Sequence, residues 1–131
     1  MGLLGAIDLP GTVTAASVAR ACMRELLTAA GHQGVDEVEL LVSELVTNAV
    51  RHTDSGRTTC GVVRLVARDT GHAVRIEVID QGSTGAIPQI PAQVDPLSES
   101  GRGLWLVREL SSAWGWEQDT TGRTIWFEVT G

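Results

Sequence analysis

The hydrophobic pattern of this 131-residue chain changes its period between residues 52 and 61, and the change limits the folds that the chain can adopt. Over residues 12–52 apolar side chains recur at the spacing of amphipathic helices. Over residues 61–80 they alternate with polar side chains, as in strands that bury one face. Helices followed by adjacent strands predict two layers, in which the helices cover one face of a sheet.

The expected elements follow one another without a linker or a repeat, so we predict one domain covering residues 1–131. Its predicted fold is an α+β two-layer sandwich, with a mixed, largely antiparallel sheet and helices on one face. The elements in chain order are an edge strand 3–9, helices 12–30 and 36–52, strands 61–68 and 73–80 joined by a hairpin at 69–72, a helix 101–110, and a closing hairpin of strands 114–118 and 123–129. Asp36 and Glu39 have the spacing of a capping box at the second helix.

The composition removes several classes of function. All ten basic residues are Arg, and without Lys the chain cannot build a Walker A loop, a eukaryotic-type protein kinase site or a Schiff-base site. The formal charge of -6, with no basic run, argues against direct nucleic-acid binding. No apolar run reaches the length of a membrane span, and the N-terminus lacks the pattern of a signal peptide. With two isolated thiols, Cys22 and Cys60, the chain is expected to be cytoplasmic, with no membrane partner.

Two motifs place polar side chains beside the predicted core. Glu44 and Asn48 are four residues apart, so they are neighbours on one face of the second helix, next to its apolar stripe. Asp80 has the parity of the apolar residues of its strand, and a carboxylate on a core face is costly unless a donor satisfies it. A ligand amino group could be that donor, and Gly82 would let it approach closely. Taken singly, solvated helix residues and an ordinary strand-end turn explain both motifs.

Two further motifs lie near the C-terminus. Gly101, Arg102, Gly103 and Leu104 open the predicted third helix, where free backbone N–H groups can face an anion. Thr124 lies at the start of the last strand and by itself indicates nothing. Residues 83–100 show no clear period and contain three prolines, which is typical of a functional loop.

Taken in order, the four motifs resemble the N box, the two glycine boxes and the Thr box of the gyrase, Hsp90, histidine-kinase and MutL superfamily, the Bergerat ATP-binding fold. The matching segments are E-L-V-T-N, D-Q-G, G-R-G-L and G-R-T-I-W-F, and the likeness covers about residues 12–129. Within the superfamily the chain is most similar to the bacterial anti-sigma-factor serine kinases. The N box S-E-L-V-T-N-A-V-R-H and Trp105 after G-R-G-L carry that likeness.

The resemblance implies ATP and Mg²⁺ as cofactors, and residues 83–100 as the ATP lid. It implies Glu44 as general base, Asn48 as the Mg²⁺ ligand and Asp80 as acceptor for the adenine amino group. The remaining implied nucleotide-binding residues are Thr124, supporting the network of Asp80, Gly82, and the phosphate-cradling backbone of Gly101, Arg102, Gly103 and Leu104. The implied reaction transfers the γ-phosphate to a serine of an anti-anti-sigma partner, with sequestration of a sigma factor as a companion or alternative role.

One position departs from the kinase pattern and keeps other functions open. Glu99 lies where the kinase branch carries an Arg that reaches the γ-phosphate, and either Arg51 or Arg102 could replace that charge. The alternatives are a non-catalytic, ATP-dependent protein-binding module and a stand-alone histidine-kinase-like catalytic domain.

The last strand poses a parity problem for the Thr box. Thr124 and Trp126 share one face, and Ile125, Phe127 and Val129 share the other. If Thr124 faces the nucleotide and the helices, the apolar row faces outward and is a candidate dimer or partner surface. The equal alternative is that the chain itself covers the row.

Overall fold

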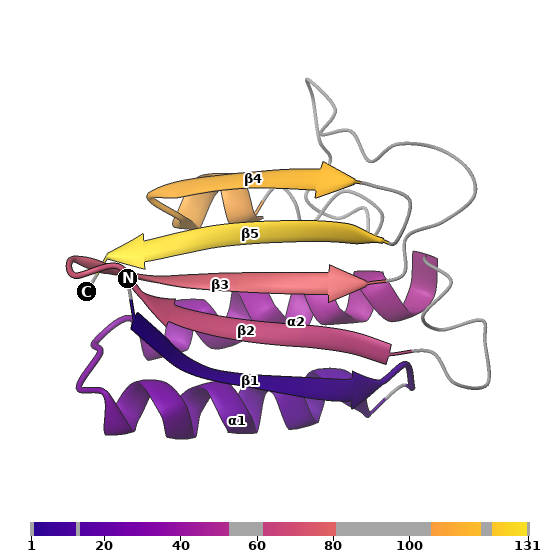
Figure 1. The fold of residues 1–131 in the computed structure, drawn as a ribbon, viewed down its shortest axis with the longest axis horizontal. Coiled ribbons are helices and arrows are strands. Elements are labelled where there is room, and N and C mark those ends of the chain that lie inside the picture. Colours follow the sequence, from indigo (N-terminus) through magenta and orange to yellow (C-terminus); the bar gives the residue numbers. More distant parts are fainter. Residues whose placement is uncertain (1, 13, 53–61, 81–105, 119–121, 131) are drawn as a thin grey trace.

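The computed structural model describes residues 2–12, 14–52, 62–80, 106–118 and 122–130. These residues form one five-stranded sheet with the strand order β1-β2-β3-β5-β4 (Figure 1). Every pairing between neighbouring strands is antiparallel. The strands are β1 (Gly2–Pro10), β2 (Val62–Asp69), β3 (Ala73–Asp80), β4 (Ala113–Gln118) and β5 (Arg123–Thr130).

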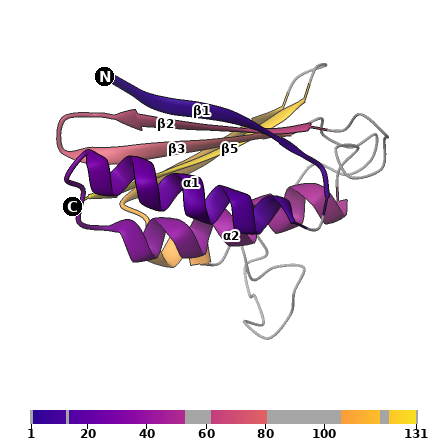
Figure 2. The ribbon, with the colours of Figure 1, turned by 90° about the horizontal axis from the view of Figure 1, so that it is seen from below.

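Two long helices, α1 (Ala15–Ala29) and α2 (Val35–His52), lie together on one face of the sheet (Figure 2). The described chain is also helical over residues 106–110, the last part of the predicted third helix. This arrangement confirms the predicted two-layer α+β fold. Within the described residues, no helix is both long and apolar enough to cross a membrane.

The core lies between the helices and the inner face of the sheet, because alternation sends every second side chain of β3 and β5 toward α2. The register pairs Val74 with Val129, Ile76 with Phe127 and Val78 with Ile125. All six side chains are buried. The helices contribute two buried stripes: Ala15, Ala19, Met23 and Leu27 from α1, and Val38, Leu41, Val42, Leu45, Val46 and Ala49 from α2.

The start of α2 differs from the prediction. The helix begins at Val35, so Asp36 lies inside its first turn and not at a cap. The carboxylates of Asp36 and Glu39 both contact the guanidinium of Arg24 on α1, with 2.8 Å between Nη2 and the nearer Asp36 oxygen. The acidic pair therefore ties the two helices together, and the predicted capping box is wrong.

The apolar row of β5 is part of the core, so of the two alternatives for this row the chain itself covers it, and the outward partner surface is wrong. Ile125, Phe127 and Val129 are buried against the helices, while Trp126 lies on the outer face. There its indole lies over Gly115 of β4, where a Cβ would come within 2.8 Å of the ring. The guanidinium of Arg75 stacks 4.0 Å from the centre of the same indole.

The inner face can be tested at Phe127, one of its fully buried side chains. We expect Phe127→Ala to lower the free energy of unfolding by about 3–5 kcal/mol, because the loss of the ring leaves a cavity. Thr130→Ala, at an exposed position on the same strand, is the matched control, with an expected change within about 0.5 kcal/mol. Urea denaturation measures both, and equal effects would contradict the assignment of faces.

Candidate functional site

Three elements end or begin at one end of the sheet. There β3 ends at Asp80, β5 begins at Arg123, and α2 ends at His52 (Figure 1). The apolar rows of the inner face run toward this end and give way to charged side chains. Polar groups at the boundary of a core are the arrangement expected of a binding site on a small two-layer domain.

The helix side of the site carries Glu44 and Asn48. Both are half-buried, in the C-terminal half of α2, and their spacing places them one turn apart on the same face. Leu41, Leu45 and Ala49 of the same helix are fully buried, so this polar pair borders the core. The fold thus places a carboxylate and an amide at the edge of the core, as the sequence predicts.

The strand side of the site is a buried ion pair. Asp80 is 4% exposed, and it faces the helices because it shares the parity of Val78. Arg123 lies directly opposite it in the ladder and is 9% exposed. Its Nη2 donates to the Asp80 Oδ2 at 3.3 Å. The predicted core-facing carboxylate is therefore present, and one of its donors comes from the protein itself.

This pair does not use the full capacity of the guanidinium. The contact joins one nitrogen to one oxygen at a long distance, whereas a bidentate pair makes two parallel, shorter bonds. The Nε of Arg123 is buried and has no hydrogen-bond partner. A donor of a charged group left without an acceptor costs free energy, so the site holds a hydrogen-bonding capacity that the protein does not use.

Thr124 does not join this network, which corrects the expectation from the Thr box. In the ladder it pairs with Ile79 and therefore lies on the face of the sheet away from Asp80 and the helices. One residue along a strand reverses the direction of the side chain, so Arg123 holds the place that Thr124 was expected to hold. The sequence does contain a signal for Arg123, which lies on the same face of the strand as Ile125, Phe127 and Val129. Once these three residues are recognised as core, Arg123 is expected to face the helices beside Asp80.

Several predicted site residues lie outside the described part of the chain. They include Gly82, the 83–100 loop with Glu99, and the second glycine box, Gly101, Arg102, Gly103 and Leu104. The side chain of Arg51 is not described either. Their assignments stay predictions.

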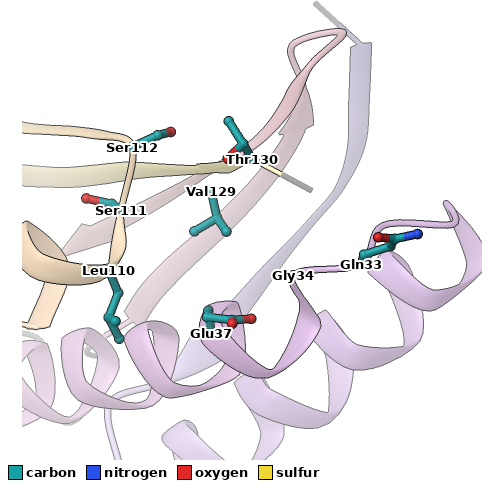
Figure 3. Close-up of a pocket in the computed structure, with 8 residues that line it drawn as sticks. All are labelled: Gln33, Gly34, Glu37, Leu110, Ser111, Ser112, Val129 and Thr130. Carbon is teal, nitrogen blue, oxygen red and sulfur yellow. The ribbon is translucent and has the colours of Figure 1, made fainter.

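A cavity of about 470 Å³ lies at the other end of the sheet (Figure 3). It opens between the start of α2, the turn after residues 106–110 and the end of β5, where Thr130 lies. Glu37 lines it from the first turn of α2, and Ser112, whose hydroxyl donates to the Glu128 carbonyl oxygen at 3.0 Å, lines it from the turn. None of the predicted site residues lines this cavity.

The chain is similar in sequence and in fold to known proteins. The family described as histidine kinase-like ATPase domain matches residues 9–129. A serine-protein kinase RsbW from Staphylococcus epidermidis is 26% identical over 113 residues, 78% of this chain and 71% of that protein. An RsbW from Staphylococcus aureus is 23% identical over the same shares. The crystal structure of the RsbU and RsbW domains of Rv1364c from Mycobacterium tuberculosis has the same fold, with a TM-score of 0.71 at 24% identity. That match covers 96% of this chain, which spans 31% of the length of the Mycobacterium chain.

The buried pair can be tested against an exposed pair of the same kind. Asp80→Ala leaves the Arg123 guanidinium buried without its carboxylate, so the free energy of unfolding should fall by about 3–5 kcal/mol. Asp8 of β1 and Arg64 of β2 also face each other across two strands, 2.7 Å apart, but their side chains are 52% and 57% exposed. Arg64 lowers the pKa of the Asp8 carboxyl by hydrogen bonding to it, and solvent screens this pair. We expect Asp8→Ala to cost much less in urea denaturation, and a loss as large as that of Asp80→Ala would refute the difference in burial.

Proposed function

Because this chain belongs to the histidine kinase-like ATPase domain family, we propose that it is an ATP-dependent protein serine/threonine kinase of the anti-sigma-factor type. The reaction would transfer the γ-phosphate of ATP to a serine of an anti-anti-sigma partner. The observation that carries the proposal is the buried carboxylate of Asp80, at the same end of the sheet as the polar face of α2. The similarity to serine-protein kinases RsbW supports serine as the acceptor.

The Asp80 carboxylate would bind the base of the nucleotide. A carboxylate is an acceptor only, so it selects a base that presents an N–H group, and the adenine amino group does so. The burial of Asp80 supports this role, because a hydrogen bond discriminates most strongly where water cannot replace the ligand. Gly82 would let the base approach the backbone at the end of β3.

Asn48 would hold the magnesium ion that accompanies ATP. Its amide oxygen is a hard ligand of the kind that Mg²⁺ accepts, and the phosphates and water would supply the other ligands. The half-buried position of Asn48, one turn after Glu44, fits a group that faces a ligand at the edge of the core. Bound Mg²⁺ would supply charge neutralisation on the phosphates during transfer. The backbone of residues 101–104 would cradle the same phosphates.

Glu44 would act as the general base. A serine hydroxyl attacks phosphorus through its oxygen, and its proton passes to a carboxylate within hydrogen-bonding reach. Phosphoryl transfer depends mainly on positioning and on charge stabilisation, so one correctly placed carboxylate beside the Mg²⁺ ligand suffices. The one-turn spacing of Glu44 and Asn48 supports this division of roles.

The partners would be proteins, and the acidic chain favours binding to proteins over binding to nucleic acid. An anti-anti-sigma-like protein would be the substrate, and a sigma factor would be sequestered by the same domain in a second mode. The proposal includes a homodimer. The apolar row of β5 would not be its interface, because that row is buried in the core.

A second function is favoured by Glu99. A carboxylate in place of the kinase-type Arg would repel the γ-phosphate, and a domain without that charge would bind ATP and a partner protein without transferring phosphate. A third function, transfer to a histidine, differs from serine transfer in the acid lability of its product.

ATP binding is tested first at Asp80. We expect Asp80→Asn to weaken ATP binding by about 1–3 kcal/mol in isothermal titration calorimetry, because an uncharged amide oxygen is a weaker acceptor than a carboxylate. Thr124→Val is the matched control, since Thr124 lies on the other face, and its affinity for ATP should equal that of the wild type. An affinity of Asp80→Asn for ATP equal to that of the wild type would refute the assignment of Asp80 to the base site.

Phosphoryl transfer is tested with radiolabelled ATP and the anti-anti-sigma partner. The wild type should yield acid-stable phosphoserine, and Glu44→Gln should lower the rate about 10²–10⁴-fold while still binding ATP, because it removes only the base. Glu37→Gln, an exposed acidic residue in the first turn of α2, should leave the rate unchanged. Tight ATP binding without transfer by the wild type would favour the binding module, and acid-labile phosphate would favour the histidine kinase.

A further inference from the structure

We propose that Arg123 is a specificity-determining residue, whose guanidinium donates a hydrogen bond to N1 of adenine while Asp80 accepts from the amino group. This inference rests on the proposed ATP site. It goes beyond that site because it assigns the base reading to a charge pair on two adjacent strands rather than to a carboxylate alone. Arg123 lies within the G-R-T-I-W-F segment, but the resemblance gave the role in that segment to Thr124.

The first observation is the burial of a cation that is only partly paired. Of the arginines that the structure describes, Arg123 is the one that is buried, and removal of a guanidinium from water is costly unless its donors find acceptors. Its Nη2 donates to a single oxygen of Asp80 at 3.3 Å, and its Nε has no acceptor. The fold therefore buries a charged donor and leaves one of its N–H groups without an acceptor.

The second observation is the contrast with an arginine that has a purely structural contact. Arg64 uses both Nε and Nη2 on the two oxygens of Asp8, at 2.7 and 3.2 Å. That bidentate geometry is the one that Arg adopts when a carboxylate is its full partner. Arg123 has a carboxylate directly opposite it in the ladder, yet it makes a single contact and keeps Nε unpaired.

The third step is the chemistry of the base. The Watson–Crick edge of adenine presents an amino donor next to the N1 acceptor, and guanine presents an acceptor, O6, next to an N–H donor. Asp80 is an acceptor only and Arg123 is a donor only, so the pair matches the adenine edge when the carboxylate lies at the amino group. In the same orientation guanine would place O6 against the carboxylate and its N–H against the guanidinium. The pair thus favours adenine through two contacts.

A structural role for Arg123 would be to neutralise Asp80 and nothing more. Both roles predict a less stable protein when the guanidinium is removed, so stability does not separate them. Only the base-reading role predicts that the protein distinguishes ATP from an analogue that lacks N1 and keeps the amino group. The analogue 1-deaza-ATP, in which a C–H group replaces N1, has this property.

The experiment is calorimetry of ATP and of 1-deaza-ATP with the wild type and with Arg123→Met. We expect the wild type to bind 1-deaza-ATP about tenfold more weakly than ATP, the scale of one hydrogen bond from a charged donor. Arg123→Met should bind the two nucleotides with equal affinity, each about as weakly as the wild type binds 1-deaza-ATP. Arg75→Met, on the outer face, is the matched control and should discriminate like the wild type.

Folding is followed by circular dichroism in each variant. Should Arg123→Met fail to fold because the Asp80 carboxylate loses the guanidinium beside it, the double variant Asp80→Asn, Arg123→Met removes both charges and serves instead. The same loss of discrimination is expected from the double variant. Discrimination that persists without the guanidinium overturns the inference, and so does a wild type that binds both nucleotides equally. In those cases ATP still binds, whereas a wild type that binds neither nucleotide refutes the proposed function itself.

Discussion

The inner face of the sheet must be covered, and this requirement organises the whole molecule. A sheet with helices on one side buries one row of side chains from each strand, and the rows of β3 and β5 are buried on the face that the helices cover. Asp80 and Arg123 continue these rows at the end where α2 terminates. The two charges can be buried on a face that is otherwise apolar because the carboxylate and the guanidinium pair with each other.

The pair of Asp80 and Arg123 has a cost that the fold does not need for its stability. Two apolar residues of similar size would pack in the same place, often with equal or greater stability. A buried charge pair with one unpaired donor is an arrangement that is more frequent at functional sites than in structural contacts, which supports the proposed role of Asp80 and Arg123. In this respect it differs from the exposed pair of Asp8 and Arg64, which stabilises a strand contact in solvent. The same end of the fold holds the polar face of α2, so base, metal and transfer roles can be divided among adjacent elements.

The reliable predictions were those that depend on local periodicity. The stripe of α2 and the alternation of β3 each required only neighbours within one element, and both proved correct, including the core-facing position of Asp80. The 69–72 hairpin was correct as well, and Gly71 has the positive φ of 101° that its turn requires. The capping box failed, because the helix begins one residue before Asp36. The carboxylates of Asp36 and Glu39 contact Arg24 of another helix instead, a contact that no local pattern contains.

The sequence by itself determined the two layers, the helix that carries Glu44 and Asn48, and a carboxylate on the core side of a strand. These features follow from the spacing of apolar residues, which recurs every 3.6 residues in a helix and every 2 residues in a strand. This spacing can be read from the sequence without knowledge of any tertiary contact. Only the tertiary structure decided which face of β5 is buried, and with it the exchange of Thr124 for Arg123 beside Asp80. One face of that strand carries Ile125, Phe127 and Val129, and the other carries Trp126 beside the Thr124 of the expected Thr box, so the two signals in the sequence favour opposite faces. The choice was made by the register with β3, a contact between residues 43 positions apart in the chain, where Arg123 meets Asp80.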